Sequence, residues 1–345
     1  MLYIDSTGSR DEASLIEDAI YDHFWSDEGA LPANIGRVDA NQQRSEPLPL
    51  RSLGALIRAR SSGAKVAAMP IARDAAPEID RLVLDVMRAV APRHGQAIRK
   101  VVADVGLDTM GRFSVFAEHL SPGPMPETLI DLRLKYGGLD ETHRLFDQLA
   151  KLGLAERADG LLTAASGLQP LLEAIEYART ETAAHAWSGQ GSTVADLLDP
   201  ARQIALNATP DHDLAVLYRD IPEPSEPPAL LLRRLTCLRY IRHHCHMRAW
   251  QREGLEGASM PPFTALWKEE TVDAERNLSP LIERSLIEGD PPALTNAGRD
   301  TRDRIEETTN EHTEVSFNTL SSTAGTDFVN SLRQLTVQVD GSPEL

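Results

Sequence analysis

Four residues of the types that often bind metal ions stand side by side at His243-His244-Cys245-His246. The surrounding pattern predicts a helix, on which residues three or four positions apart share a face. His243 and His246 could therefore chelate an ion together, but no second group of ligands stands at a suitable spacing. We expect neither a metal site nor a cofactor, and the simpler interpretation is a packed helix.

Motifs of common enzyme classes are absent from the sequence, including G-x-S-x-G, H-E-x-x-H and G-x-G-x-x-G. The glycine-rich stretch 189–193 lacks the lysine and the preceding strand of a phosphate-binding loop, so a flexible linker ending in a helix cap explains it better. We do not expect an enzyme. A catalytic group assembled from distant residues is left open, because it leaves no local motif.

Polar residues follow each of three strands predicted near the N-terminus, at residues 2–5, 35–40 and 65–72. Alternation of these strands with helices indicates a parallel sheet, and ligands bind beyond the carboxyl ends of such strands. A plain strand-to-helix turn is the alternative. The predicted site for a small-molecule effector consists of Asp5, Ser6, Ser9, Arg10, Asp39 and Arg73.

Residues 230–252 form a basic segment in an otherwise acidic chain, with six arginines and no Asp or Glu. An apolar seam runs along the predicted helix. The helix could follow DNA phosphates, but we favour pairing with acidic residues of the same chain or of another subunit. The six arginines are Arg233, Arg234, Arg239, Arg242, Arg248 and Arg252.

The whole chain of 345 residues carries a formal net charge of -17. Duplex DNA is a dense line of negative charge, so DNA binding would need a local basic face. No stretch approaches the roughly 20 apolar residues that span a membrane, and no secretory signal begins the sequence. We expect a cytoplasmic protein that does not enter membranes and keeps Cys237 and Cys245 reduced.

Two segments about 130 residues apart resemble each other. Residues 139–145 align with 272–278, and Leu162-Thr163 aligns with Leu294-Thr295 after a one-residue gap. This period is too long for a solenoid, so a duplicated domain is the simpler explanation.

The first copy has the predicted order helix (125–134), turn, helix (140–152) and hairpin (154–163). Asp159-Gly160 between two short apolar runs is a typical hairpin turn. In the second copy the corresponding helix spans 274–286, and Pro280 is expected to bend it.

The stretch 149–157, with the later Asp159-Gly160 and Leu162-Thr163, resembles the recognition helix and wing of MarR-like and ArsR-like winged helix-turn-helix regulators. The resemblance covers both copies and implies that the second helix of each enters the major groove, while the wing meets a phosphate. The neighbouring Asp140, Glu141 and Asp147 favour an alternative, in which this helix is a solvated acidic face. The implied DNA-binding residues are Thr142, His143, Arg144, Lys151 and Arg157 in the first copy, and Arg276 and Asn277 in the second.

We therefore predict a mainly α fold with α+β winged-helix units after a small N-terminal α/β domain. The expected divisions are a sensor or interaction domain (1–76), a first winged-helix domain (77–188), a linker with short helices (189–228) and a degenerate second winged-helix domain (229–345). The favoured function is a transcriptional regulator that binds double-stranded DNA, responds to a small-molecule effector and forms a homodimer. The alternative is a winged-helix-derived protein that binds a small molecule or a protein instead of DNA.

Overall fold

The structure is a computed structural model that describes residues 70–106, 120, 123–128, 146–209, 213–270, 272 and 277–338. These residues belong to one compact unit and are mainly helical, as the sequence predicts. The N-terminal α/β domain is predicted for residues 1–76. Of these, residues 1–69 lie outside the described residues.

The described helices are α2 (Ile71–Asp104), α6 (Gln169–Ala186), α7 (Gly191–Leu206), α8 (Asp213–Asp220), α9 (Pro227–Arg252), α10 (Met260–Trp267), α11 (Ser279–Glu283), α12 (Asn296–Phe317) and α13 (Ser322–Gln334). Short 3-10 turns, η2 (Ser166–Leu168) and η3 (Gly257–Ser259), precede α6 and α10. The strands are β1 (Met125–Pro126), β2 (Ala155–Ala158), β3 (Leu161–Ala164), β4 (Ile287–Glu288) and β5 (Ala293–Leu294).

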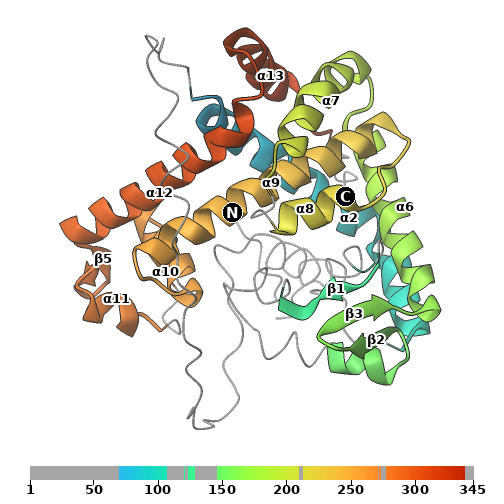
Figure 1. Ribbon diagram of the computed structural model, residues 1–345, viewed down its shortest axis with the longest axis horizontal. Helices are drawn as coiled ribbons and strands as arrows, with labels where there is room; N and C mark the ends of the chain where they lie inside the picture. The colour runs from blue at the N-terminus through green and yellow to red at the C-terminus, as the bar shows by residue number, and fades with distance from the viewer. Residues whose placement is uncertain are drawn as a thin grey trace, which may run out of the picture. The chain divides into compact units, whose positions relative to one another are not determined.

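Helix α9 is the central element, and α2, α6, α7, α8 and α12 pack against it (Figure 1). Two prolines begin it, at positions where a helix has no backbone hydrogen bond to lose. Gly254, in the left-handed region with φ +70°, follows its end. Most of its side chains are buried, which agrees with the helix predicted at 230–252.

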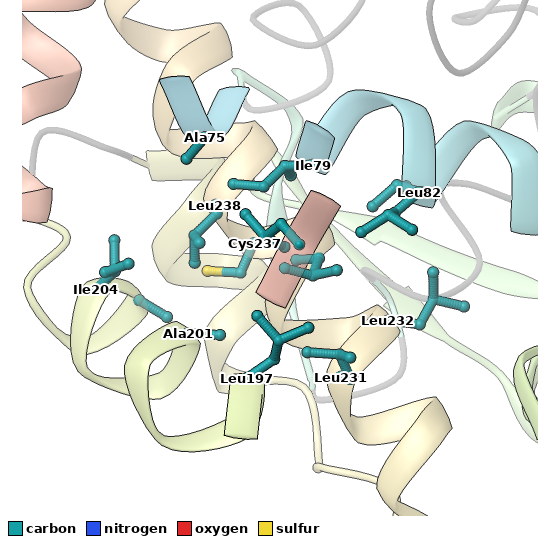
Figure 2. Close-up of a cluster of buried hydrophobic side chains, with 14 of the residues drawn as sticks. Ala75, Ile79, Leu82, Leu197, Ala201, Ile204, Leu231, Leu232, Cys237 and Leu238 are labelled. Atoms are coloured by element: carbon teal, nitrogen blue, oxygen red, sulfur yellow. The ribbon is translucent and has the colours of Figure 1, made fainter. Parts of the chain in front are cut away.

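The largest core joins α2, α7, α9 and α13. Each contributing helix places apolar side chains three or four positions apart, so that one face points into the core (Figure 2). Side chains at its centre are Ala75, Ile79 and Leu82 of α2, Leu197, Ala201 and Ile204 of α7, and Leu231, Leu232, Cys237 and Leu238 of α9. Helix α7 falls within the segment predicted as a linker, yet it supplies part of this core.

Helix α2 begins at Ile71, so the strand predicted for residues 65–72 is wrong at Ile71 and Ala72. Two backbone N–H groups at this N-terminus, those of Ile71 and Ala72, donate to the Glu314 carboxylate at 3.1 and 2.7 Å. A carboxylate stabilises a helix N-terminus, and this one comes from α12, 242 residues further along the chain. The tertiary contact favours the helical conformation there over the strand that local sequence suggests.

Strands β2 and β3 form the predicted hairpin, with Ala158 opposite Leu161. Asp159 and Gly160 have positive φ of 52° and 72°, as the two central residues of a type I′ turn require. Strand β1 pairs with the outer edge of β3 and completes a three-stranded antiparallel sheet. The helix predicted to begin at residue 125 is therefore wrong at Met125 and Pro126, because backbone pairing with β3 makes them a strand.

The second copy contains α11 and a smaller hairpin of β4 and β5, packed on Trp250, Phe263 and Ile305. The prediction of a helix over 274–286 bent at Pro280 is wrong, since Asn277 and Leu278 are not helical and α11 starts at Ser279. Pro280 lies in the first turn of α11. There its missing N–H group removes no helical hydrogen bond.

Helices α7 and α13 pack in a reciprocal way. Helix α7 follows α6 and packs on α9, whereas α13 follows α12 and packs on α2. Gly325 of α13 approaches Ile71 so closely that an added Cβ atom would lie 2.1 Å from its Cδ1 atom. Each half of the described chain thus ends in a helix that packs on a long helix of the other half.

Candidate nucleic-acid interface

The predicted DNA-reading helix of the first copy is described from residue 146 to 151. Its inner face is fixed by Phe146 and Leu149, both buried in the core beneath the three-stranded sheet. Lys151 is exposed near its end, and the hairpin begins four residues later. Three further residues of the predicted interface, Thr142, His143 and Arg144, lie outside the described residues.

Arg157 lies on β2 with its guanidinium group bound to two carboxylates. Its Nε and Nη2 atoms donate to the two carboxylate oxygens of Glu127 at 2.6 and 2.7 Å, and Nη1 donates to Asp147 at 2.7 Å. The hydrogen bonds to Glu127 are the main cause of a raised pKa of Arg157. The group of three side chains has a net charge of -1, although Arg157 was predicted to offer a positive charge to a phosphate.

No local pattern in the sequence indicates this ion-pair group. Glu127 is 30 residues from Arg157, and Asp147 is 10 residues away. From the sequence, Asp147 is only an acidic neighbour of the predicted DNA-binding residues, and Glu127 belongs to the predicted leading helix. The contact follows from the pairing of β1 with β3, which local spacing does not reveal.

Two DNA-binding residues are predicted in the second copy, Arg276 and Asn277. The structure describes Asn277, whereas Arg276 lies outside the described residues. The Asn277 side chain is exposed, and its Oδ1 atom accepts a hydrogen bond from the Ser279 backbone N–H at 3.1 Å. Asn277 therefore satisfies a donor at the start of α11, a common role for asparagine at helix N-termini.

Four arginines of α9 pair with carboxylates of the same chain, which confirms the intramolecular interpretation of the basic segment. Their partners lie on α6, in the loop before α9, on α2 and on α12. The pairs are Arg233–Glu176 at 2.8 Å, Arg234–Glu223 at 2.8 Å, Arg239–Asp80 at 3.0 Å, and Arg242–Glu306. Hydrogen bonds from Arg234 lower the pKa of Glu223.

The histidine-rich stretch belongs to the packed surface between α9 and α12. His246 Nδ1 lies 3.2 Å from Thr309 Oγ1, and burial lowers the pKa of His246 well below its usual value. In the part of the chain that the structure describes, no three His, Cys, Asp or Glu residues are placed to hold a metal ion. Burial raises the pKa of the Cys237 thiol to about 12 and also raises that of Cys245.

A groove with a cavity volume of about 770 Å³ lies between α2, α9, α12 and the end of α10. Arg73 lines it and is exposed on α2, whereas the sequence placed this residue after a strand. The other members of the predicted ligand site, Asp5, Ser6, Ser9, Arg10 and Asp39, lie outside the described residues. The Trp267 indole forms one wall, donates to Asp303 at 2.7 Å and stacks on the Arg302 guanidinium group.

Comparison with protein families shows that residues 192–342 are similar to a helix-turn-helix family. This region begins in α7 and ends beyond α13, so it contains the second copy and its flanking helices. Searches of curated proteins and of solved structures found no match. Among the described residues, no helix is long and apolar enough to cross a membrane.

Proposed function

We propose that the protein is a DNA-binding transcriptional regulator built from two winged-helix units, of which the first contacts DNA. The observation that carries this proposal is the three-stranded sheet of the first unit. Its hairpin follows directly on the helix that ends near Lys151, and β1 precedes that helix. In winged-helix proteins the same order presents the helix to the major groove and the hairpin to the flanking backbone.

The second unit supports the tandem arrangement. Helix α9 precedes it, the short helix α11 leads into the β4–β5 hairpin, and α12 follows the hairpin as α6 does in the first unit. Residues 192–342 are similar to a helix-turn-helix family, which supports a helix-turn-helix unit in this part of the chain and does not extend to the first unit.

We assign the DNA contact to the first unit because its hairpin and helix end present the better surface. Strands β2 and β3 have four residues each, whereas β4 and β5 have two. Helix α11 has only five residues and exposes Ile282. Lys151 is exposed at the end of the first helix, where a flexible ammonium group suits a phosphate.

The proposal is tested by titrating the protein with genomic DNA fragments at several salt concentrations. We expect saturable binding at low salt that weakens steeply as salt is added. Lys151→Ala should reduce the slope of log affinity against log salt by about one, because one phosphate contact is lost. The control is Lys100→Ala, which removes an exposed lysine of α2 that pairs with Asp104 and should leave the slope unchanged.

The second candidate function is binding of a small molecule or a protein without DNA. Two features favour it: the 770 Å³ groove with Arg73 and Trp267 in its lining, and the pairing of Arg157 with two carboxylates. The net charge of -17 also opposes DNA binding. Absence of saturable DNA binding at low salt, with a folded protein, would replace the first proposal with this one.

A further inference from the structure

We propose that Arg157 is a positioning residue that holds the β2–β3 hairpin at a fixed angle to the DNA-reading helix, and that it does not contact a phosphate. This inference rests on the proposed DNA-binding function. It assigns to Arg157 a role opposite to the one that its place on the hairpin suggests.

The first argument is geometric. The guanidinium group joins three elements, since Arg157 lies on β2, Asp147 on the helix and Glu127 directly after β1. Three N–H groups in one rigid plane bind the two carboxylates, so the side chain cannot turn without losing at least one hydrogen bond. A lysine could not reproduce this planar arrangement.

A backbone contact at the same place supports this role. The Glu127 N–H group donates to the Gly160 carbonyl at the hairpin turn, at 2.9 Å. Glu127 thus binds the turn through its backbone and Arg157, near the turn end of β2, through its side chain. The hairpin is attached at two points to the residue that follows β1.

The second argument is electrostatic. Three Arg157 N–H groups already bind carboxylate oxygens, so a phosphate at this place would approach two carboxylates. A phosphate could reach only the two remaining Arg157 N–H donors, or would have to displace Glu127 or Asp147 from the other three. Lys151 is exposed and is therefore the better candidate for a phosphate contact in this part of the interface.

The test compares variants in the DNA titration, after circular dichroism shows that each is folded. Arg157→Ala should weaken binding by about three- to tenfold without changing the salt slope, because the hairpin angle relaxes while no phosphate contact is lost. Arg157→Lys should not restore affinity, since it keeps the charge but not the planar hydrogen bonds. Glu127→Gln should also weaken binding. Arg88→Ala, which breaks an exposed pair with Asp85 on α2, is the matched control.

Three results would overturn the inference: a salt slope reduced by about one in Arg157→Ala, restored affinity in Arg157→Lys, or tighter binding by Glu127→Gln. The last would mean that Glu127 competes with phosphate for a contacting arginine. A folded Arg157→Ala protein that binds DNA like the wild type would overturn it as well.

A separate measurement keeps this inference distinct from the proposed function. Amide hydrogen exchange of β2 and β3 should be faster in Arg157→Ala than in the wild type and in Arg88→Ala, with or without DNA. If the wild type binds no DNA, the proposed function fails and the inference fails with it as a statement about DNA contact. Unchanged hairpin exchange in Arg157→Ala would show that Arg157 does not hold the hairpin.

Discussion

Ion pairs join several helices of this protein, and the clearest case is Glu306 of α12. It accepts from Arg242 of α9 and from Arg302 one turn earlier on its own helix. Burial raises the pKa of Glu306, but the arginines outweigh burial and lower it to about 2. The carboxylate is therefore ionised at neutral pH and compensates two largely buried guanidinium groups.

We predict that Glu306→Gln lowers the free energy of unfolding by about 2 to 3 kcal/mol, because two arginines lose their counter-charge. This is somewhat less than the cost of breaking a fully buried ion pair. Urea denaturation at pH 7 measures the change. Asp85→Asn, which removes the carboxylate of the exposed Arg88 pair, is the control and should cost less than about 1 kcal/mol. Equal effects of both substitutions would show that Glu306 contributes no more than a surface charge.

His246 predicts how stability depends on pH. Burial lowers its folded-state pKa well below the ordinary 6.5, and Arg302 and Arg242 act in the same direction, while Glu306 opposes them. As pH falls, His246 is protonated in the unfolded chain before it is protonated in the folded chain. The stability that the neutral, buried His246 provides is therefore complete above pH 6.5 and is lost as pH falls below it. The loss is at most about 1.4 kcal/mol per pH unit.

Urea denaturation at pH 7.5, 6.5 and 5.5 should therefore show falling stability for the wild type and a weaker fall for His246→Asn. His312→Asn is the comparison, because burial also lowers the pKa of His312 but its contact with Arg252 is exposed. Identical pH dependence in the wild type and His246→Asn would contradict this account.

Among the elements, those controlled by local chemistry were predictable from the sequence. Asp159-Gly160 adopts the positive φ values that its hairpin needs, and the apolar pattern of α9 fits its buried position. Strand β1 was missed because Met125 and Pro126 become a strand only by pairing with residues of β3, more than 30 positions away. The bend expected at Pro280 is wrong because α11 starts one residue earlier, at Ser279, and local sequence does not indicate this helix start.

The candidate site was predictable to a smaller extent. The position of Lys151 near a helix end followed from the repeat, whereas the carboxylate partners of Arg157 follow from the packing of three elements. Arg73 lies on the helix α2 and lines a groove that includes residues of α12. Contacts between segments so far apart leave no periodic or spacing signal.

Helix α12 and the β4–β5 hairpin meet at Gly298, where there is no room for a side chain. A Cβ atom there would lie 2.0 Å from the Leu286 carbonyl oxygen. We predict that Gly298→Ala lowers the free energy of unfolding by about 1 to 3 kcal/mol, because backbone must move. Thermal denaturation followed by circular dichroism measures this.

Gly167 is the control, since it lies in the short 3-10 turn between the β2–β3 hairpin and α6. A Cβ atom there would meet the flexible tip of Leu154 at 3.2 Å. Gly167→Ala should therefore cost less than Gly298→Ala. The reverse order would show that the close approach of α12 to Leu286 is not a constraint on the fold.

At the scale of the whole described chain, the two halves stabilise each other through α7 and α13. Leu197 and Ile204 of α7 are 0% exposed and belong to the core that includes α9. Separation of the halves would expose this apolar face, and burial of such side chains contributes about 1.5 to 3 kcal/mol each.

We predict that fragments 70–209 and 213–338 do not unfold cooperatively when each is produced alone, and that they form a one-to-one complex when produced together. Size-exclusion chromatography and thermal denaturation provide the measurements. A fragment 70–209 that unfolds cooperatively at the temperature of the full chain would show that the first half is an independent domain.

The central claim is that the first unit contacts DNA, and site-directed cross-linking tests it most directly. A photoreactive thiol reagent would be attached to Ala158→Cys, beside the hairpin turn, and in a separate protein to Ile282→Cys on α11. Both positions are exposed, and the native Cys237 and Cys245 are buried with raised pKa values, which keeps them from reacting at neutral pH. We predict that bound DNA cross-links to position 158 and not to position 282. Cross-linking at position 282 alone, or at neither position, would contradict the account.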